Sequence, residues 1–154
     1  MIAAVAAMLV PAAHAMHVDP RGLGQVLVFP YYTVNGGNDT LFAVTNTTAH
    51  AKALRVRFHE GYDGRGVLDF DVYVGPHGAW SASVTSSGGD ASLARLVTSD
   101  PACTLPALAA HAIDFGVASF AGENAPTGPT GEADGGPSTP DRTREGHFDV
   151  FEMG

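Results

Sequence analysis

Apolar and polar residues alternate with a period of two from Gln25 to about Thr98, and this pattern constrains the fold more than any other feature. Such alternation places apolar side chains on one face of a strand, and turn residues about every ten positions separate the runs. The expected strands are residues 25–29, 40–46, 52–59, 67–74, 80–84 and 93–98, with a last run at 147–152. The sequence therefore predicts a mainly β protein, an antiparallel immunoglobulin-like β-sandwich.

One pair of runs predicts its own register. Residues 52–59 and 67–74 flank a glycine-rich loop, and a hairpin centred near Asp63 places Arg57 opposite Asp69 and Arg55 opposite Asp71. The same register places the apolar residues of both strands on the other face, so charge and hydrophobicity agree. In the next run, Trp80 shares a face with Ala82 and Val84 and is expected to fill the core.

The organisation fits one domain. Hydrophobic residues make up 45% of the 154 residues and charged residues 16%, enough to bury a core. The sandwich is expected over residues 16–121, and the Gly- and Pro-rich segment 122–146 is expected to be a flexible loop. Residues 147–154 would be a final strand cut short, which leaves the sandwich incomplete at its C-terminus. Residues 105–120 are apolar but irregular, and fit either one helical turn or extended packing.

The first fifteen residues resemble a secretory leader. Residues 1–11 are uncharged and mostly apolar, and Ala13-His14-Ala15 fits a signal-peptidase site. The run is too short to span a membrane. No basic residue precedes it, so residues 1–15 are interpreted as a signal peptide truncated at its start. We expect an exported protein: periplasmic, at the cell surface or secreted, with no membrane span in the mature chain.

Charge and motifs exclude several functions. The net charge is −8 and the only lysine is Lys52, so nucleic-acid binding is not expected. No dinucleotide fingerprint, nucleophile elbow or phosphate-binding loop occurs, so no catalytic residue and no cofactor is predicted. His59-Glu60 begins like a zinc-protease motif, but Asp63 occupies the position of the second histidine. The expected protein is not an enzyme.

The candidate metal and sugar sites of this sequence also have plainer explanations. Three aspartates near the hairpin loop have hard oxygen ligands, but they lack calcium-loop spacing and are better explained as partners of the arginines. They are Asp63, Asp69 and Asp71.

Three histidines would form a metal site only if the fold joined their loops, so no metal ligand is predicted. They are His50, His59 and His77.

Five aromatic residues could form a platform that stacks on sugar rings, but packing in the core and in turns is the simpler interpretation. They are Tyr31, Tyr32, Tyr62, Tyr73 and Trp80.

Cys103 is the only cysteine, and an odd count is unusual in an exported protein. Three interpretations remain open: a buried free thiol, a disulfide with a cysteine outside this chain, and a reactive thiol. The disulfide with an outside partner is the one we expect. The reactive thiol is disfavoured because no neighbouring residue in the sequence would lower its pKa.

Several segments together resemble a group of exported bacterial proteins of unknown function. They are GQVLVFPYYTVNGGNDT at 24–40, VTNTT at 44–48, RVRFHEG at 55–61, RTREG at 142–146 and EMG at 152–154. The resemblance implies a longer chain with a second cysteine, but it carries no activity. We therefore expect a non-enzymatic extracytoplasmic domain, structural or adhesive, that contacts an unidentified surface or protein partner and self-associates through its terminal strand. The alternative is a carbohydrate-binding module or appended domain of a secreted hydrolase, with Tyr31, Tyr32 and Tyr62 in its loops.

Overall fold

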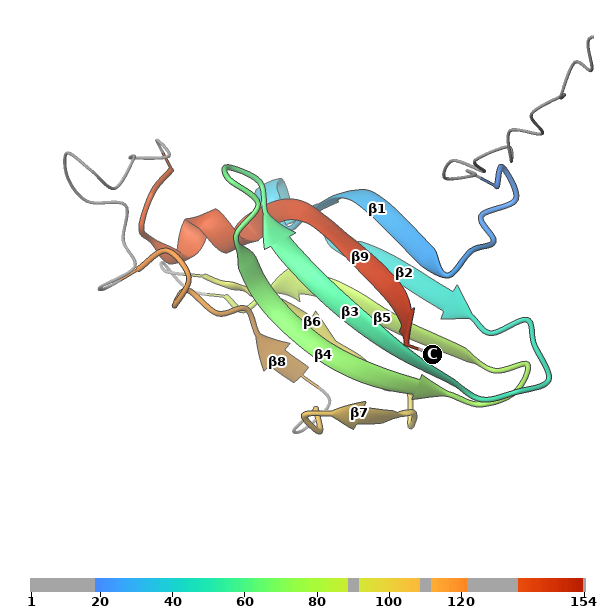
Figure 1. The fold of residues 1–154 in the computed structure, drawn as a ribbon. Coiled ribbons are helices and arrows are strands. Elements are labelled where there is room, and N and C mark those ends of the chain that lie inside the picture. Colours follow the sequence, from blue (N-terminus) through green and yellow to red (C-terminus); the bar gives the residue numbers. More distant parts are fainter. Residues whose placement is uncertain (1–18, 89–91, 109–111, 122–135, 154) are drawn as a thin grey trace, which may run out of the picture.

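The protein is a sandwich of two antiparallel sheets, as the alternation predicted (Figure 1). The computed structural model describes residues 19–88, 92–108, 112–121 and 136–153, so the predicted leader lies outside them. The five-stranded sheet has the order β1-β9-β3-β4-β7, and the four-stranded sheet has the order β2-β5-β6-β8. The strands are β1 Val26–Thr33, β2 Thr40–Thr45, β3 Lys52–Glu60, β4 Gly66–Val74, β5 Ala79–Ser86, β6 Ala94–Val97, β7 Cys103–Leu105, β8 Ala112–Asp114 and β9 Glu145–Met153. The mainly β sandwich is thus confirmed, and its immunoglobulin-like nature stays a prediction.

The β3–β4 hairpin has the predicted register. Arg57 lies opposite Asp69 and Arg55 lies opposite Asp71. On the inward face, Val56 and Phe58 of β3 are fully buried. Two independent patterns in the sequence therefore located the same pairing.

Aromatic rings fill the space between the sheets. Trp80 is fully buried, as predicted, and its ring centroid lies 5.6 Å from those of Phe42 and Phe70. Phe148 of β9 stacks on Phe58 of β3 with centroids 4.6 Å apart. Full burial of such side chains stabilises a fold by about 1.5–3 kcal/mol each, so this cluster holds the two layers together.

β1 continues through Pro30, where the sequence predicted that the strand stops. Its pairing with β9 shifts register between Phe29 and Tyr32, so that Pro30 and Tyr31 together oppose His147. β1 is the edge of its sheet. Proline is tolerated at edges and bulges because no ladder hydrogen bond is lost there.

β9 is not an exposed terminal edge, and that expectation was wrong. It lies between β1 and β3 and pairs with both along nearly its whole length (Figure 1). The ladder therefore has no free edge at β9 for the predicted self-association.

The second part of the predicted loop 122–146 is packed against the sandwich. The 3₁₀ helix η4, Pro140–Arg144, leads directly into β9, and it buries Arg142 and Thr143. Residues 122–135 lie outside the described residues. In the irregular stretch 105–120, β8 is extended and a turn at 117–120 buries Phe120, so the described part combines extended packing with one turn.

Candidate functional site

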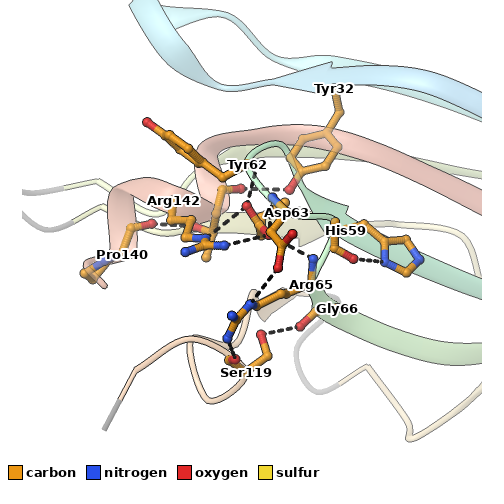
Figure 2. A network of polar contacts seen from close by, with 12 residues as sticks. Tyr32, His59, Tyr62, Asp63, Arg65, Gly66, Ser119, Pro140 and Arg142 are labelled. Atoms are coloured by element: carbon orange, nitrogen blue, oxygen red, sulfur yellow. Dashed lines mark hydrogen bonds and ion pairs between the residues drawn. The ribbon is translucent and has the colours of Figure 1, made fainter. Parts of the chain in front are cut away.

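A buried ion pair joins the β3–β4 hairpin to η4 (Figure 2). Glu60 at the end of β3 and Arg142 of η4 both have fully buried side chains. Nη2 of Arg142 donates to Oε1 of Glu60 at 3.0 Å, and Nε lies 3.0 Å from Oε2. One hydrogen bond and one further close charge contact therefore hold the guanidinium against the carboxylate.

The same carboxylate organises the hairpin loop. It accepts backbone hydrogen bonds from Tyr62 at 2.7 Å, Asp63 at 3.1 Å and Arg65 at 2.8 Å. Burial raises the pKa of Glu60, but the bonds from Arg142 and from the three backbone amides outweigh it and hold the pKa below its ordinary value. An ionised carboxylate whose two oxygens already accept these bonds suits structure rather than proton transfer.

Aromatic and backbone contacts enclose the guanidinium. The Cζ atom of Arg142 lies 5.5 Å from the ring centroid of Tyr62 and 5.0 Å from that of Phe120. The hydroxyl of Tyr32 donates to the carbonyl of Thr143 at 2.9 Å. Burial, together with the charges of Glu60 and Glu145, raises the pKa of Tyr32, so the hydroxyl keeps its proton. The network therefore joins segments that are distant in sequence. We call the ion pair of Glu60 and Arg142, together with its contacts to the hairpin loop, the clasp.

The aspartates considered for calcium are held by arginines. Asp69 and Asp71 both pair with Arg55, at 2.5 Å and 3.0 Å. Asp63 lies in the hairpin loop, where its carboxylate is 3.3 Å from Nε of Arg65. The structure thus agrees with the plainer interpretation, in which these carboxylates are ion-pair partners.

The three histidines considered for a metal do not meet. The turn that carries His77 bonds to Thr48, close to His50, whereas His59 lies at the far end of β3. His59 instead meets His147 and Asp149 of β9, and the ligand atoms of all three lie within 4.8 Å of one another. Sequence reasoning missed this group because strand pairing brings distant residues together. The spacing of His147 and Asp149 by two was the available signal.

The five aromatic residues form no platform. Tyr32 and Trp80 are fully buried in the core, which contradicts a role for Tyr32 in a sugar-binding loop. Tyr31, Tyr62 and Tyr73 are exposed. Tyr31 donates to Glu145 at 3.1 Å, while Tyr62 lies against Arg142.

Cys103 is exposed on the edge strand β7, so the interpretation as a buried thiol is wrong. Its strand partner is Tyr73 of β4. Within the described residues the thiol has no disulfide, and a partner outside the chain stays a prediction.

An apolar strip follows the outer edge of β1, which pairs with no further strand among the described residues. Val26 and Val28 are 52% and 66% exposed, and Phe151 of β9 lies directly opposite Val26. The amide of Glu152 donates to the carbonyl of Gln25. Because hydrogen-bonded and non-hydrogen-bonded pairs alternate in an antiparallel ladder, Val26 and Val28 direct their own N–H and C=O groups away from β9. We call Val26, Val28 and Phe151 the β1 strip.

A cavity of about 240 Å³ opens between the sheets near the start of β3. Leu27, Val44 and Leu54 contribute its apolar wall, and the ion pair of Lys52 with Glu152 lies at its lining. It is smaller than the cavities of roughly 300–1,000 Å³ that hold drug-sized ligands.

Comparison of the chain with protein-family models, with curated proteins and with solved structures found no match. Among the described residues, no helix has the length and apolar character needed to cross a membrane.

Proposed function

We propose that this chain is a non-enzymatic extracytoplasmic domain with a structural or adhesive role that acts through surface contacts. The observation that carries the proposal is the β1 strip, at a sheet edge to which the described part of the chain adds no further strand. Natural proteins usually protect such edges with charges, so exposed valines on an edge strand favour contact with a partner.

Strand addition is the contact that this edge suits best. Val26 and Val28 present backbone donors and acceptors outward, and their side chains offer apolar contact on the outer face of the sheet. An extended segment of a protein partner would extend the five-stranded sheet at β1. A second copy of this chain pairing through β1 is an alternative occupant that the test below distinguishes.

The buried charges support a role without catalysis. Glu60 and Arg142 are occupied with each other and with the hairpin loop, and they lie away from solvent. The leader-like residues 1–15 support export.

The test follows the protein in cells and in solution. We expect the chain in the extracytoplasmic fraction, bound to the cell envelope, and we expect Val28→Lys to release it. Leu105→Lys is the matched control, because Leu105 is 61% exposed on β7 at the opposite edge of the same sheet. Sedimentation of the purified protein shows whether a second copy is the occupant. Hydrolysis of glycoside, ester or peptide substrates, a cytoplasmic location, or equal release of both variants would overturn the proposal.

Carbohydrate binding is the second candidate function. Tyr31 and Tyr62 are 59% and 56% exposed, and both approach the start of β9: Tyr31 bonds Glu145, and Gly61, next to Tyr62, lies against the backbone of Glu145. Exposed aromatic faces can stack on sugar rings. A glycan array should show binding that Tyr31→Ala and Tyr62→Ala abolish and Tyr73→Ala leaves unchanged. A blank array would exclude this function.

A further inference from the structure

The outer face of the five-stranded sheet carries two histidines and an aspartate in metal-ligand positions. His59 of β3 lies directly opposite His147 of β9, and Asp149 follows two residues later. Because side chains alternate along a strand, buried Phe58 and Phe148 point into the core and these three residues point outward. The two imidazole rings stack with centroids 5.0 Å apart and an angle of 11° between their planes.

The orientation of His59 leaves one ring nitrogen available to a metal ion. Its Nδ1 lies 2.9 Å from the carbonyl oxygen of Gly64. A carbonyl only accepts hydrogen bonds, so Nδ1 carries the proton and Nε2 of the neutral ring keeps its lone pair. A backbone carbonyl on the distal nitrogen is the usual support for a metal-binding histidine.

The distance between the ring of His59 and the carboxylate of Asp149 is closer to the spacing of two ligands on one metal ion than to a hydrogen bond. Nε2 of His59 lies 3.9 Å from Oδ2 of Asp149, which is too far for a direct hydrogen bond. Ligand atoms on one tetrahedral zinc ion, each at roughly 2.0–2.2 Å, lie about 3.4 Å apart. The ligand atoms of the three residues lie within 4.8 Å of one another, so turning one imidazole out of the parallel stack would bring them to bonding distance.

We propose that His59, His147 and Asp149 bind a late first-row divalent metal ion, represented by Zn²⁺. Two imidazole nitrogens and one carboxylate suit zinc and its neighbours, whereas Ca²⁺ and Mg²⁺ prefer oxygen ligands. The side chains of His59 and Asp149 are 17% and 21% exposed, so the ion would be reached from solvent and would keep a position for water or a partner's ligand. Arg57 lies opposite Asp149 in the ladder, but its half-exposed guanidinium lies 3.9 Å from the carboxylate of Asp69 on the other neighbouring strand.

Calorimetry on the untagged full chain, freed of metal by a chelator, tests the proposal. We expect one Zn²⁺ per chain, with an affinity that falls at least tenfold in His147→Gln and in His59→Gln. His50→Gln and His77→Gln are matched controls, because both residues are exposed at the other end of the sandwich. The two control variants should bind zinc as tightly as the original chain does. Ca²⁺ and Mg²⁺ should produce no heat.

A second readout separates binding from folding. Zn²⁺ should raise the melting temperature of the original chain and of both controls but not of His59→Gln/His147→Gln, whose fold is checked by the fluorescence of buried Trp80. The histidine ring signals of residues 59 and 147 should shift in NMR spectra on zinc addition. Equal zinc binding by the double variant and the original chain, or no binding by the original chain, would overturn the proposal.

Discussion

Replacing Arg142 by methionine tests whether the clasp holds the fold. Methionine keeps much of the apolar volume between the rings of Tyr62 and Phe120, but it removes the charge that faces Glu60. The carboxylate would stay buried with its three backbone donors and without its cation. The substitution therefore removes the ion pair and the other contacts of the guanidinium while it keeps much of the apolar packing.

The expected loss is large because both side chains are fully buried. Removing one partner of a buried pair costs about 3–5 kcal/mol, a large share of the roughly 5–15 kcal/mol that stabilises a domain. An exposed pair gives the contrast: Arg95 and Asp114 have side chains 38% and 44% exposed, and Arg95→Met should cost far less than Arg142→Met.

Urea unfolding followed by Trp80 fluorescence measures both variants, since Trp80 is the only tryptophan and is buried. With a slope of about 2 kcal/mol per molar urea, Arg142→Met should lower the midpoint by about 2 M. Glu60→Gln should also destabilise, and the double variant should lose about 1–3 kcal/mol less than the sum of the two. A midpoint for Arg142→Met no lower than that of Arg95→Met, or strict additivity, would refute the reasoning.

Three further results are expected. The pKa of Glu60 is lowered in the folded state, so its stabilisation is complete above its ordinary value of 4.5 and is lost as the pH falls through the folded pKa. As the pH falls below about 4.5, the unfolding free energy should therefore fall more steeply in the original chain than in Glu60→Gln. Gly146→Ala should destabilise by about 3 kcal/mol or more in the same urea assay, because its Cβ atom would meet the backbone oxygen of His59 on the adjacent strand, whereas Gly66→Ala meets nothing within 4 Å and should be mild. Cys103 is exposed and should react with a thiol reagent in the native state, and labelling only after denaturation would contradict its position on β7.

Local patterns in the sequence located the elements that depend on local chemistry. The register of β3 and β4 followed from two alternations, of charge and of apolar residues, in segments joined by a short loop. The burial of Trp80 followed from its place in an alternating run. Both features are set by neighbours in sequence, so they could be predicted without knowing the order of the strands.

The position of β9 could not be predicted, because strand order is set by contacts between distant segments. The alternation of residues 147–152 predicts a strand, but it does not identify the strands that pair with it. These are β1 and β3, which come far earlier in the chain. Composition also gave no sign of the place of Arg142, because a Gly- and Pro-rich segment predicts a loop on average. The contact of Arg142 with Glu60 and the hydrogen bond from Tyr32 to Thr143 hold η4 against the sandwich.

The clasp and the histidine pair depend on the same hairpin loop. Glu60 binds the backbone amides of Asp63 and Arg65, on either side of Gly64, and the Gly64 carbonyl orients His59. Gly64 has a φ of +72°, a conformation that glycine adopts at little cost and that lets the loop reverse within these few residues. Arg142, which contacts the carboxylate, lies in η4. This helix is followed directly by β9, which carries His147 and Asp149. A buried charge pair therefore joins the loop that orients His59 to the helix that precedes His147, so we expect a change in the clasp to be felt at the outer histidine group through residues 60–65.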